Sequence, residues 1–351
     1  MQLAIDPRRH TGKLTGGNIN DVVMSIVKCS ISVVLVGVFG LVGYTVIRAS
    51  GTDLSHLQAE RDRDVAVLIA QATPDSLATA AWLAQPLSGE GTPGKSLELI
   101  ERAETLAPNR PELVWLHRAI CERALCDMQP QIESKIRELD PGNGFVWAWE
   151  LQRGRDSFSA PMVTEVLVRM GASSKMTDYT NQLEVMTVDA MGMARPSLNL
   201  TSRVVYGIGM VAALPIPASS QISKACRLEQ FDQPGRRAAC ETLMARMEQS
   251  SAVILQSMAL RIQERWWPVD SPQREVLNTK RRRLDYLMEV SGRMRWWRMN
   301  RDMAVRIDAA RRTEREEDVE LVMVKSFGMS TEPPSDWKDD ASSRWEPLRA
   351  L

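Results

Sequence analysis

Five cysteines are the residues with the most evident chemistry in this 351-residue chain. Cys29 stands alone near the start, whereas Cys121, Cys126, Cys226 and Cys240 lie farther along. An even number of cysteines is typical of disulfides when a chain folds in an oxidising compartment. Of the three ways to pair four cysteines, the simplest joins near neighbours, Cys121 with Cys126 and Cys226 with Cys240.

Two other states of these four cysteines remain open. Buried free thiols are one alternative, because cysteine packs as a small apolar side chain. A zinc site is less favoured, because Cys-x4-Cys followed by Cys-x13-Cys is not the usual arrangement of zinc ligands. His117 lies one helical turn before Cys121, but one such pair makes neither a metal site nor a catalytic dyad.

The predicted bridges constrain the helices that carry them. Residues five apart in a continuous helix lie on different faces, so a Cys121–Cys126 bridge requires the first helix to end near Arg123. The other pair encloses Pro234-Gly235, which breaks a helix. Two antiparallel helices on either side of that turn can bring Cys226 and Cys240 together.

The compartment is indicated by Ser30 to Ile47, eighteen residues without a charge. As a helix this run is about 27 Å long, close to the ~30 Å apolar core of a bilayer. Lys and Arg are more frequent before the run than directly after it, which places the N-terminus in the cytoplasm. We therefore expect a single-pass anchor in the inner or plasma membrane over residues 22–48, with the C-terminal region periplasmic or otherwise extracytoplasmic.

Two other interpretations of the apolar run remain. A cleaved signal peptide is less favoured, because the run exceeds the usual apolar length of about 7–15 residues and the segment from Tyr44 to Gly51 lacks a small-x-small cleavage site. A buried core helix is the third interpretation. Arg61 and Arg63 weaken the charge asymmetry on which the orientation rests.

Composition predicts an all-α protein. Helix formers dominate the sequence, and long alternations of β-branched residues are absent. The 44 Lys and Arg balance the 44 Asp and Glu, so net charge gives no indication of a nucleic-acid partner. The sequence contains no Gly-rich phosphate loop, no Gly-x-Ser-x-Gly and no His-Glu-x-x-His, and its three histidines do not favour a metal centre. We expect no cofactor and no small-molecule ligand.

Residues 74–154 repeat with a period of 33 or 34 residues. Both proline and tryptophan recur at this spacing: Pro74, Pro108 and Pro141, and Trp82, Trp115 and Trp149. A period of this length predicts an array of helical hairpins.

Two turns within the array are similar to the hinges between consecutive tetratricopeptide repeats. Ala103 to Asn109 and Arg137 to Asn143 resemble the family's Leu-Asp-Pro-x-Asn type turn, after which an aromatic follows. The chain departs from the family in lacking the Gly and Tyr of its first helix. The resemblance implies a concave surface that binds peptides or proteins. The candidates either line that surface or pack between hairpins as core: Trp82, Trp115, Trp147 and Trp149.

Farther along, Lys280 to Arg315 is basic with aromatic residues inside it. The candidate residues are Arg295, Trp296, Trp297 and Arg298. Three interpretations are open. The residues bind a membrane surface or a partner, or they bind nucleic acid. In the third interpretation they belong to a solvated helix whose arginines pair with nearby carboxylates and cover apolar surface. Export makes nucleic acid the least favoured, and the expected partner is a protein. The paired carboxylates would be Asp285, Glu289, Asp302 and Asp308.

The expected organisation follows from these segments. A cytoplasmic tail (1–21) precedes the anchor (22–48), the repeat region (54–154), further helical hairpins (155–330) and a polar, extended or disordered tail (331–351). The end of the chain, from Phe327 to Trp337, is similar to the ends of uncharacterised bacterial envelope proteins and implies no activity. We predict a membrane-anchored scaffold that binds a protein in the cell envelope. The alternative is an envelope enzyme acting on wall or lipid polymers through carboxylates.

Overall fold

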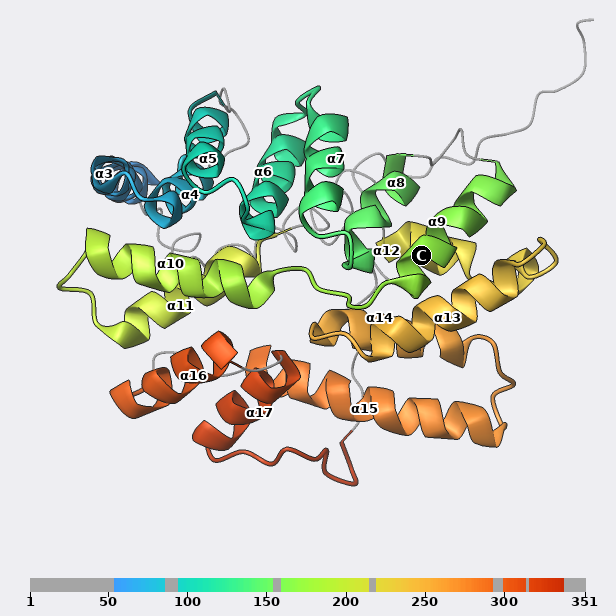
Figure 1. Cartoon of the computed structure of the whole chain (residues 1–351). Helices are drawn as coiled ribbons and strands as arrows, with labels where there is room; N and C mark the ends of the chain where they lie inside the picture. Colours follow the sequence, from blue (N-terminus) through green and yellow to red (C-terminus); the bar gives the residue numbers. More distant parts are fainter. Residues whose placement is uncertain are drawn as a thin grey trace, which may run out of the picture.

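The computed structural model describes residues 54–85, 94–153, 159–214, 219–292, 299–313 and 316–337. Within these ranges every regular element is a helix, as Figure 1 shows, and the predicted all-α class is confirmed. The expected cytoplasmic tail and the apolar run from Ser30 to Ile47 lie outside the described residues. Of the helices that are described, none has the length and apolar character needed to cross a bilayer.

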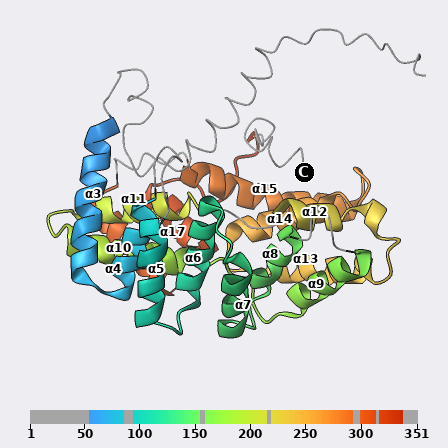
Figure 2. The same cartoon turned by 90° about the horizontal axis from the view of Figure 1, so that it is seen from above.

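The first helices lie side by side in a row, which both views show (Figures 1 and 2). Each helix from α3 to α6 packs against the next one in the sequence. The row contains α3 (Leu54–Gln71), α4 (Pro74–Leu83), α5 (Gly94–Leu106), α6 (Pro111–Ala124), α7 (Gln129–Leu139), a 3-10 helix (Gly144–Trp147), α8 (Ala148–Arg153) and α9 (Ala160–Ala172).

Local sequence sets where these helices begin. The side chains of Thr73 and Ser76 each accept a hydrogen bond from the other's backbone N–H, at 3.1 and 3.0 Å, and so cap α4. Pro74 and Pro111 occupy first-turn positions of α4 and α6, where a missing N–H is tolerated. The repeat differs at Pro141, which precedes a 3-10 helix capped by Asn143.

Two further layers lie beneath this row in Figure 1. The middle layer packs against the row through contacts of α10 with α3 and α4 and of α13 with α9, and the lower layer packs on α10, α11 and α14. The middle layer contains α10 (Thr180–Ala194), α11 (Leu200–Val211), α12 (Ser219–Ala225), a 3-10 helix (Leu228–Gln230), α13 (Arg236–Glu248) and α14 (Val253–Glu264). The lower layer contains α15 (Pro272–Gly292), α16 (Arg301–Thr313) and α17 (Glu316–Ser326).

One hydrophobic core crosses the expected boundary at residue 154. Its centre is Trp115, whose ring centroid lies 4.2 Å from that of Trp149 and 5.5 Å from that of Tyr179, just before α10. The same cluster of buried residues continues from Val65 in α3 to Ile262 in α14. The row and the middle layer therefore share their interior.

The helix ends bring the predicted cysteine pairs together. The α6 helix ends at Ala124, and Leu125 turns the chain in the left-handed conformation at φ 53°, so Cys121 and Cys126 have Cα atoms 5.2 Å apart. Cys226 follows α12, and Cys240 lies in α13 after the turn at Gly235, where φ is +71°. Their Cα atoms are 5.6 Å apart. Both distances fit a disulfide, so the expected local pairing is confirmed.

A buried guanidinium joins the middle and lower layers. Arg311 of α16 pairs with Glu184 of α10, and both side chains are almost fully buried. Burial raises the pKa of Glu184 to about 7, a rise to which Glu320 and Asp308 add and which Arg311 opposes. Burial also raises the pKa of Glu320 to about 7, opposed by its hydrogen bond with Ser291 and by Arg311. The guanidinium of Arg311 thus opposes the rise in pKa of two carboxyl groups, Glu184 and Glu320.

These two carboxyl groups make the stability of the fold depend on pH. An acid whose pKa is higher in the folded chain takes up a proton on folding, so the free energy of unfolding falls as the pH rises from about 4.5 toward about 7. One such group contributes at most about 1.4 kcal/mol per pH unit in this window. We expect Glu320→Gln to make the fall in Tm between about pH 5 and about pH 8 shallower than in the parent protein.

Thermal unfolding followed by circular dichroism across this pH range measures the slope. Glu98→Gln is the matched control, because its side chain is 69% exposed on α5, and it should leave the slope unchanged. Parallel curves of Tm against pH for Glu320→Gln and the parent protein would contradict the raised pKa of Glu320.

The Cys226–Cys240 bridge gives a second prediction. It closes a separation of 14 residues, and a loop of about 15 residues stabilises a fold by roughly 3 kcal/mol in the chain-entropy model. We expect Cys226→Ser to lower the free energy of unfolding by this order, measured in urea without reductant. The control is the parent protein in reductant, whose free energy of unfolding should fall by at least as much. Alkylation of Cys226 and Cys240 in the unreduced, urea-unfolded parent would show that the bridge is absent.

Candidate partner-binding site

Three exposed apolar side chains lie in or just after the connection from α14 to α15. Trp267 and Val269 lie in the connection and Val276 in the second turn of α15, and they are 38%, 74% and 57% exposed. We call these three residues the α14–α15 tip. Single exposed apolar residues are ordinary on a protein surface, but three within one short stretch of the hairpin make it a candidate interaction site.

The local sequence explains why the tip faces outward. Ser271 accepts a hydrogen bond from the backbone N–H of Arg274 at 3.3 Å, and Pro272 then occupies the first position of α15. The neighbouring tryptophan turns inward: the Trp266 indole N–H donates to the Cys226 carbonyl at 2.8 Å, and its ring meets Phe231 edge-on at 5.3 Å. Trp266 therefore anchors the connection and leaves Trp267 at the surface.

A cavity of about 520 Å³ opens beside the tip. Its lining mixes the apolar side chain of Val269 with three carboxylates and two guanidinium groups. The lining residues are Glu264, Val269, Asp270, Ser271, Arg274, Glu275, Asn278 and Arg281.

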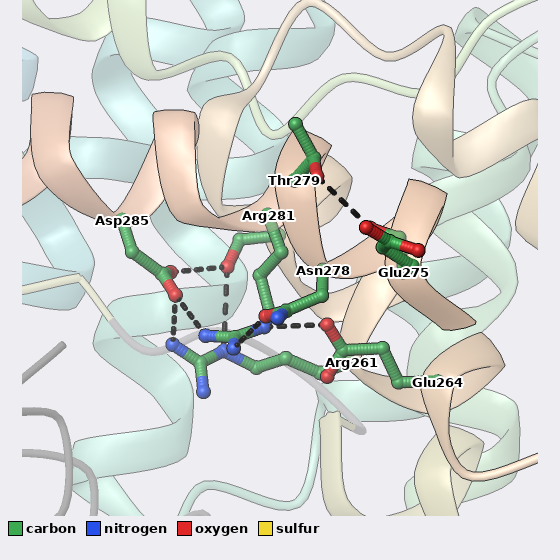
Figure 3. A network of polar contacts seen from close by, with 8 residues as sticks. Arg261, Glu264, Glu275, Asn278, Thr279, Arg281 and Asp285 are labelled. Carbon is green, nitrogen blue, oxygen red and sulfur yellow. Dashed lines mark hydrogen bonds and ion pairs between the residues drawn. The ribbon is translucent and has the colours of Figure 1, made fainter. Parts of the chain in front are cut away.

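The cavity borders a polar network that holds α14 and α15 together (Figure 3). Asp285 is only 6% exposed. It accepts from Arg261 of α14 at 2.8 Å and from Arg281 of α15 at 2.5 Å, and from the hydroxyl of Ser257 at 3.1 Å. Both carboxylate oxygens are thus hydrogen-bonded, as a buried charge requires.

Arg281 connects this buried network to the cavity wall. Besides Asp285, it pairs with Glu264 at 2.7 Å and donates to the side-chain oxygen of Asn278 at 2.8 Å. Three partners fix the planar guanidinium. A carboxylate whose oxygens already accept several strong hydrogen bonds is poorly placed to take a proton from a substrate. The network therefore suits a rigid support for a binding surface.

The tryptophans singled out in the repeat region lie elsewhere. Trp115 and Trp149 are 2% and 1% exposed, and Trp82 is 7% exposed, so these three pack as core, which is the second of the two roles that the sequence left open. Trp147 is half-buried, and the guanidinium groups of Arg137 and Arg169 lie 5.0 and 4.9 Å from its ring centroid.

The basic candidates of the C-terminal region are not placed. Arg295, Trp296, Trp297 and Arg298 lie outside the described residues. The long helix expected over residues 280–315 is described in two parts, because α15 ends at Gly292 and α16 begins at Arg301. The expected pairing of arginines with carboxylates is present in both, as Arg281 with Asp285 and Arg312 with Asp308.

The α14–α15 tip was not singled out from the sequence. Apolar periodicity identifies a buried face, but it assigns no role to an apolar residue in a connection such as Val269. The available signal was the pair Trp266-Trp267 directly before Pro268, which places aromatic residues in a turn.

Across the ranges that the structure covers, no group of three or more His, Cys, Asp or Glu side chains is arranged to hold a metal ion.

No protein-family model, curated protein or solved structure matches this chain. The tetratricopeptide resemblance of residues 74–154 therefore stays a prediction. The site is interpreted from its own geometry.

Removing the central carboxylate tests the network. Asp285→Ala leaves two guanidinium groups without their shared partner, and breaking a buried ion pair costs about 3–5 kcal/mol. The matched control is Glu241→Ala, which removes an exposed helical pair with Arg237 and should cost less than about 1 kcal/mol. Urea unfolding measures both, and equal losses would show that the network does not stabilise the hairpin.

Proposed function

We propose that this chain is a membrane-anchored helical scaffold that binds a protein partner in the cell envelope through the α14–α15 tip. The observation that carries the proposal is the exposed apolar tip beside a cavity lined by charged groups. An apolar centre with a polar rim is the usual composition of a protein interface.

The rigidity of the hairpin supports binding at this place. Arg261 and Arg281 attach α15 to α14 through Asp285, and Trp266 attaches the connection to the disulfide-bearing segment at Cys226. A surface held in one conformation loses little conformational entropy when a partner binds.

The proposed compartment rests on two features. Two cysteine pairs at disulfide distance favour an oxidising environment. The uncharged run from Ser30 to Ile47, with more Lys and Arg before it than directly after it, favours an anchor that exports the C-terminal region. Together they support an inner or plasma membrane location with the helical body extracytoplasmic.

An envelope enzyme is less well supported. Such an enzyme needs carboxylates free to exchange protons or attack a substrate. In the cavity, Glu264 is paired with Arg281 at 2.7 Å, and the carboxylates share the space with two guanidinium groups. This mixture of charges suits binding better than acid–base catalysis.

Site-specific crosslinking in membranes tests the proposal. We expect a photoreactive amino acid at Val269 or Val276 to crosslink one protein reproducibly, identified by mass spectrometry. The matched controls carry it at Val168 of α9 and Val305 of α16, which are similarly exposed, at 50% and 48%. The same protein crosslinked from all four positions, or none from the first two, would contradict binding at the tip.

A charged substitution gives the complementary test. Val269→Glu places a carboxylate in the apolar centre of the proposed interface, and Val168→Glu is its control. We expect the first variant alone to weaken partner binding at least about tenfold, or about 1.4 kcal/mol. Point variants are preferable to deleting residues 74–154, because Trp115 in that region packs against Tyr179 outside it.

A further inference from the structure

The segment after α17 returns to the surface of α15. Gly328 adopts φ +71°, a conformation that favours glycine, and the backbone N–H of Met329 donates to the Val324 carbonyl at 3.1 Å. The chain then runs along the lower layer, as the red trace leaving α17 in Figure 1 shows. The sequence predicted an extended or disordered tail from residue 331, whereas residues 331–337 contact α15 and include a turn at Ser335 and Asp336.

One arginine makes most of the contacts with this segment. The Nη2 atom of Arg282 lies 3.2 Å from the Pro334 carbonyl and 3.4 Å from the Ser335 carbonyl, and it also donates to the Trp337 carbonyl. The same guanidinium lies 5.3 Å from the centroid of the Trp337 ring. Carbonyl groups and an aromatic ring are thus recognised by a single side chain.

Tyr286 and Arg283 complete the contact surface. Tyr286 lies one helical turn after Arg282 and meets Trp337 edge-on, with ring centroids 5.6 Å apart. Arg283 pairs with Glu332 at 3.3 Å. We call Arg282, Arg283 and Tyr286 the α15 peptide face.

The bound segment is a compact turn with little buried surface. The Trp337 N–H donates to the Pro334 carbonyl at 3.0 Å, and two consecutive prolines restrict the conformations of the free segment. Glu332, Pro334, Ser335 and Asp336 remain exposed. Attachment to α17 keeps the segment at a high effective concentration, so a weak contact is enough to hold it.

We propose that the α15 peptide face is a peptide-binding surface for an acidic, proline-containing segment with one aromatic residue, presented by the partner protein. The proposal rests on the proposed function, because it identifies the chemistry of that partner. The chain's own Glu332–Trp337 segment occupies the face until the partner displaces it.

Three observations support an exchangeable peptide ligand. Two of the three face residues are cationic and the occupying segment carries Glu332 and Asp336, so the charges are complementary. Recognition of backbone carbonyls by Arg282 does not depend on the side chains of the segment, and another chain can supply them. The aromatic contact with Tyr286 then selects peptides with a ring at the end of the turn.

Fluorescence anisotropy with a labelled peptide of residues 330–337 tests the proposal on the full purified chain. Trp337→Ala weakens the hold on the chain's own segment, so this variant should bind the peptide with saturation and at least about tenfold more tightly than the parent protein. Adding Arg282→Ala to the Trp337→Ala variant should abolish this gain in peptide affinity. A peptide with Trp337 replaced by alanine is the control ligand and should not bind.

Folding and geometry are controlled separately. Arg282→Lys in the Trp337→Ala background keeps the positive charge and loses the planar guanidinium, and it should also lose peptide binding while its circular dichroism melt matches that of its parent. The proposal is wrong if the Trp337→Ala variant binds no peptide, if parent and variant bind equally, or if binding survives Arg282→Lys unchanged.

This result is separable from the proposed function. Absence of the crosslink at Val269 would contradict the tip as a partner site, whether or not the peptide binds to the α15 peptide face. Peptide binding that fails while the crosslink persists would overturn the α15 peptide face alone.

Discussion

The structure depends on the burial of Trp115 among aromatic rings from three segments. Phe145 comes from the 3-10 helix and Trp149 from α8, and Tyr179 comes from the connection that begins the middle layer. The phenol group of Tyr179 donates to Asp140 at 2.6 Å and accepts from the Asn143 side chain at 3.1 Å. Burial and the Asp140 carboxylate raise the pKa of Tyr179, so the phenol keeps the proton that it donates. Large rings supply apolar area, and their polar atoms fix the packing direction.

Buried charge pairs add specificity around this centre. Arg118 is 1% exposed, pairs with the fully buried Glu133 at 2.9 Å and lies 5.1 Å from the centroid of Trp149. Glu104 accepts from His117 at 2.7 Å and from Lys135 at 2.5 Å. Such pairs gain little net stability after desolvation, but an unpartnered buried charge is costly. They therefore oppose any register in which α5, α6 and α7 are displaced along one another.

Features encoded within a few turns could be predicted from the sequence, and features made by distant segments could not. The bridge of Cys121 to Cys126 follows from a helix end, and that of Cys226 to Cys240 follows from the turn that they enclose. The role of Trp115 depends on Tyr179, which periodicity within the repeat does not identify. The segment after Pro141 differs from those after Pro74 and Pro108 because Asn143 caps a 3-10 helix and forms a β-bridge with Lys175.

The same distinction applies to the candidate site. Arg281 and Asp285 lie one helical turn apart, so their pairing follows from the sequence. Arg261, in contrast, reaches Asp285 from the preceding helix. The exposure of Val269 depends on how α14 and α15 meet. Single-sequence analysis therefore identifies which residues are charged or apolar, but it does not identify which of them share a surface.

The hydrogen bond from Trp266 to the Cys226 carbonyl makes the α14–α15 connection depend on the Cys226–Cys240 bridge. The carbonyl belongs to the cysteine that is bridged to α13, so the position of this acceptor is fixed once the bridge has formed. A newly made chain in a reducing environment has the tryptophan but lacks the covalent constraint on its acceptor. Reduction of the Cys226–Cys240 bridge is therefore expected to loosen the connection between α14 and α15.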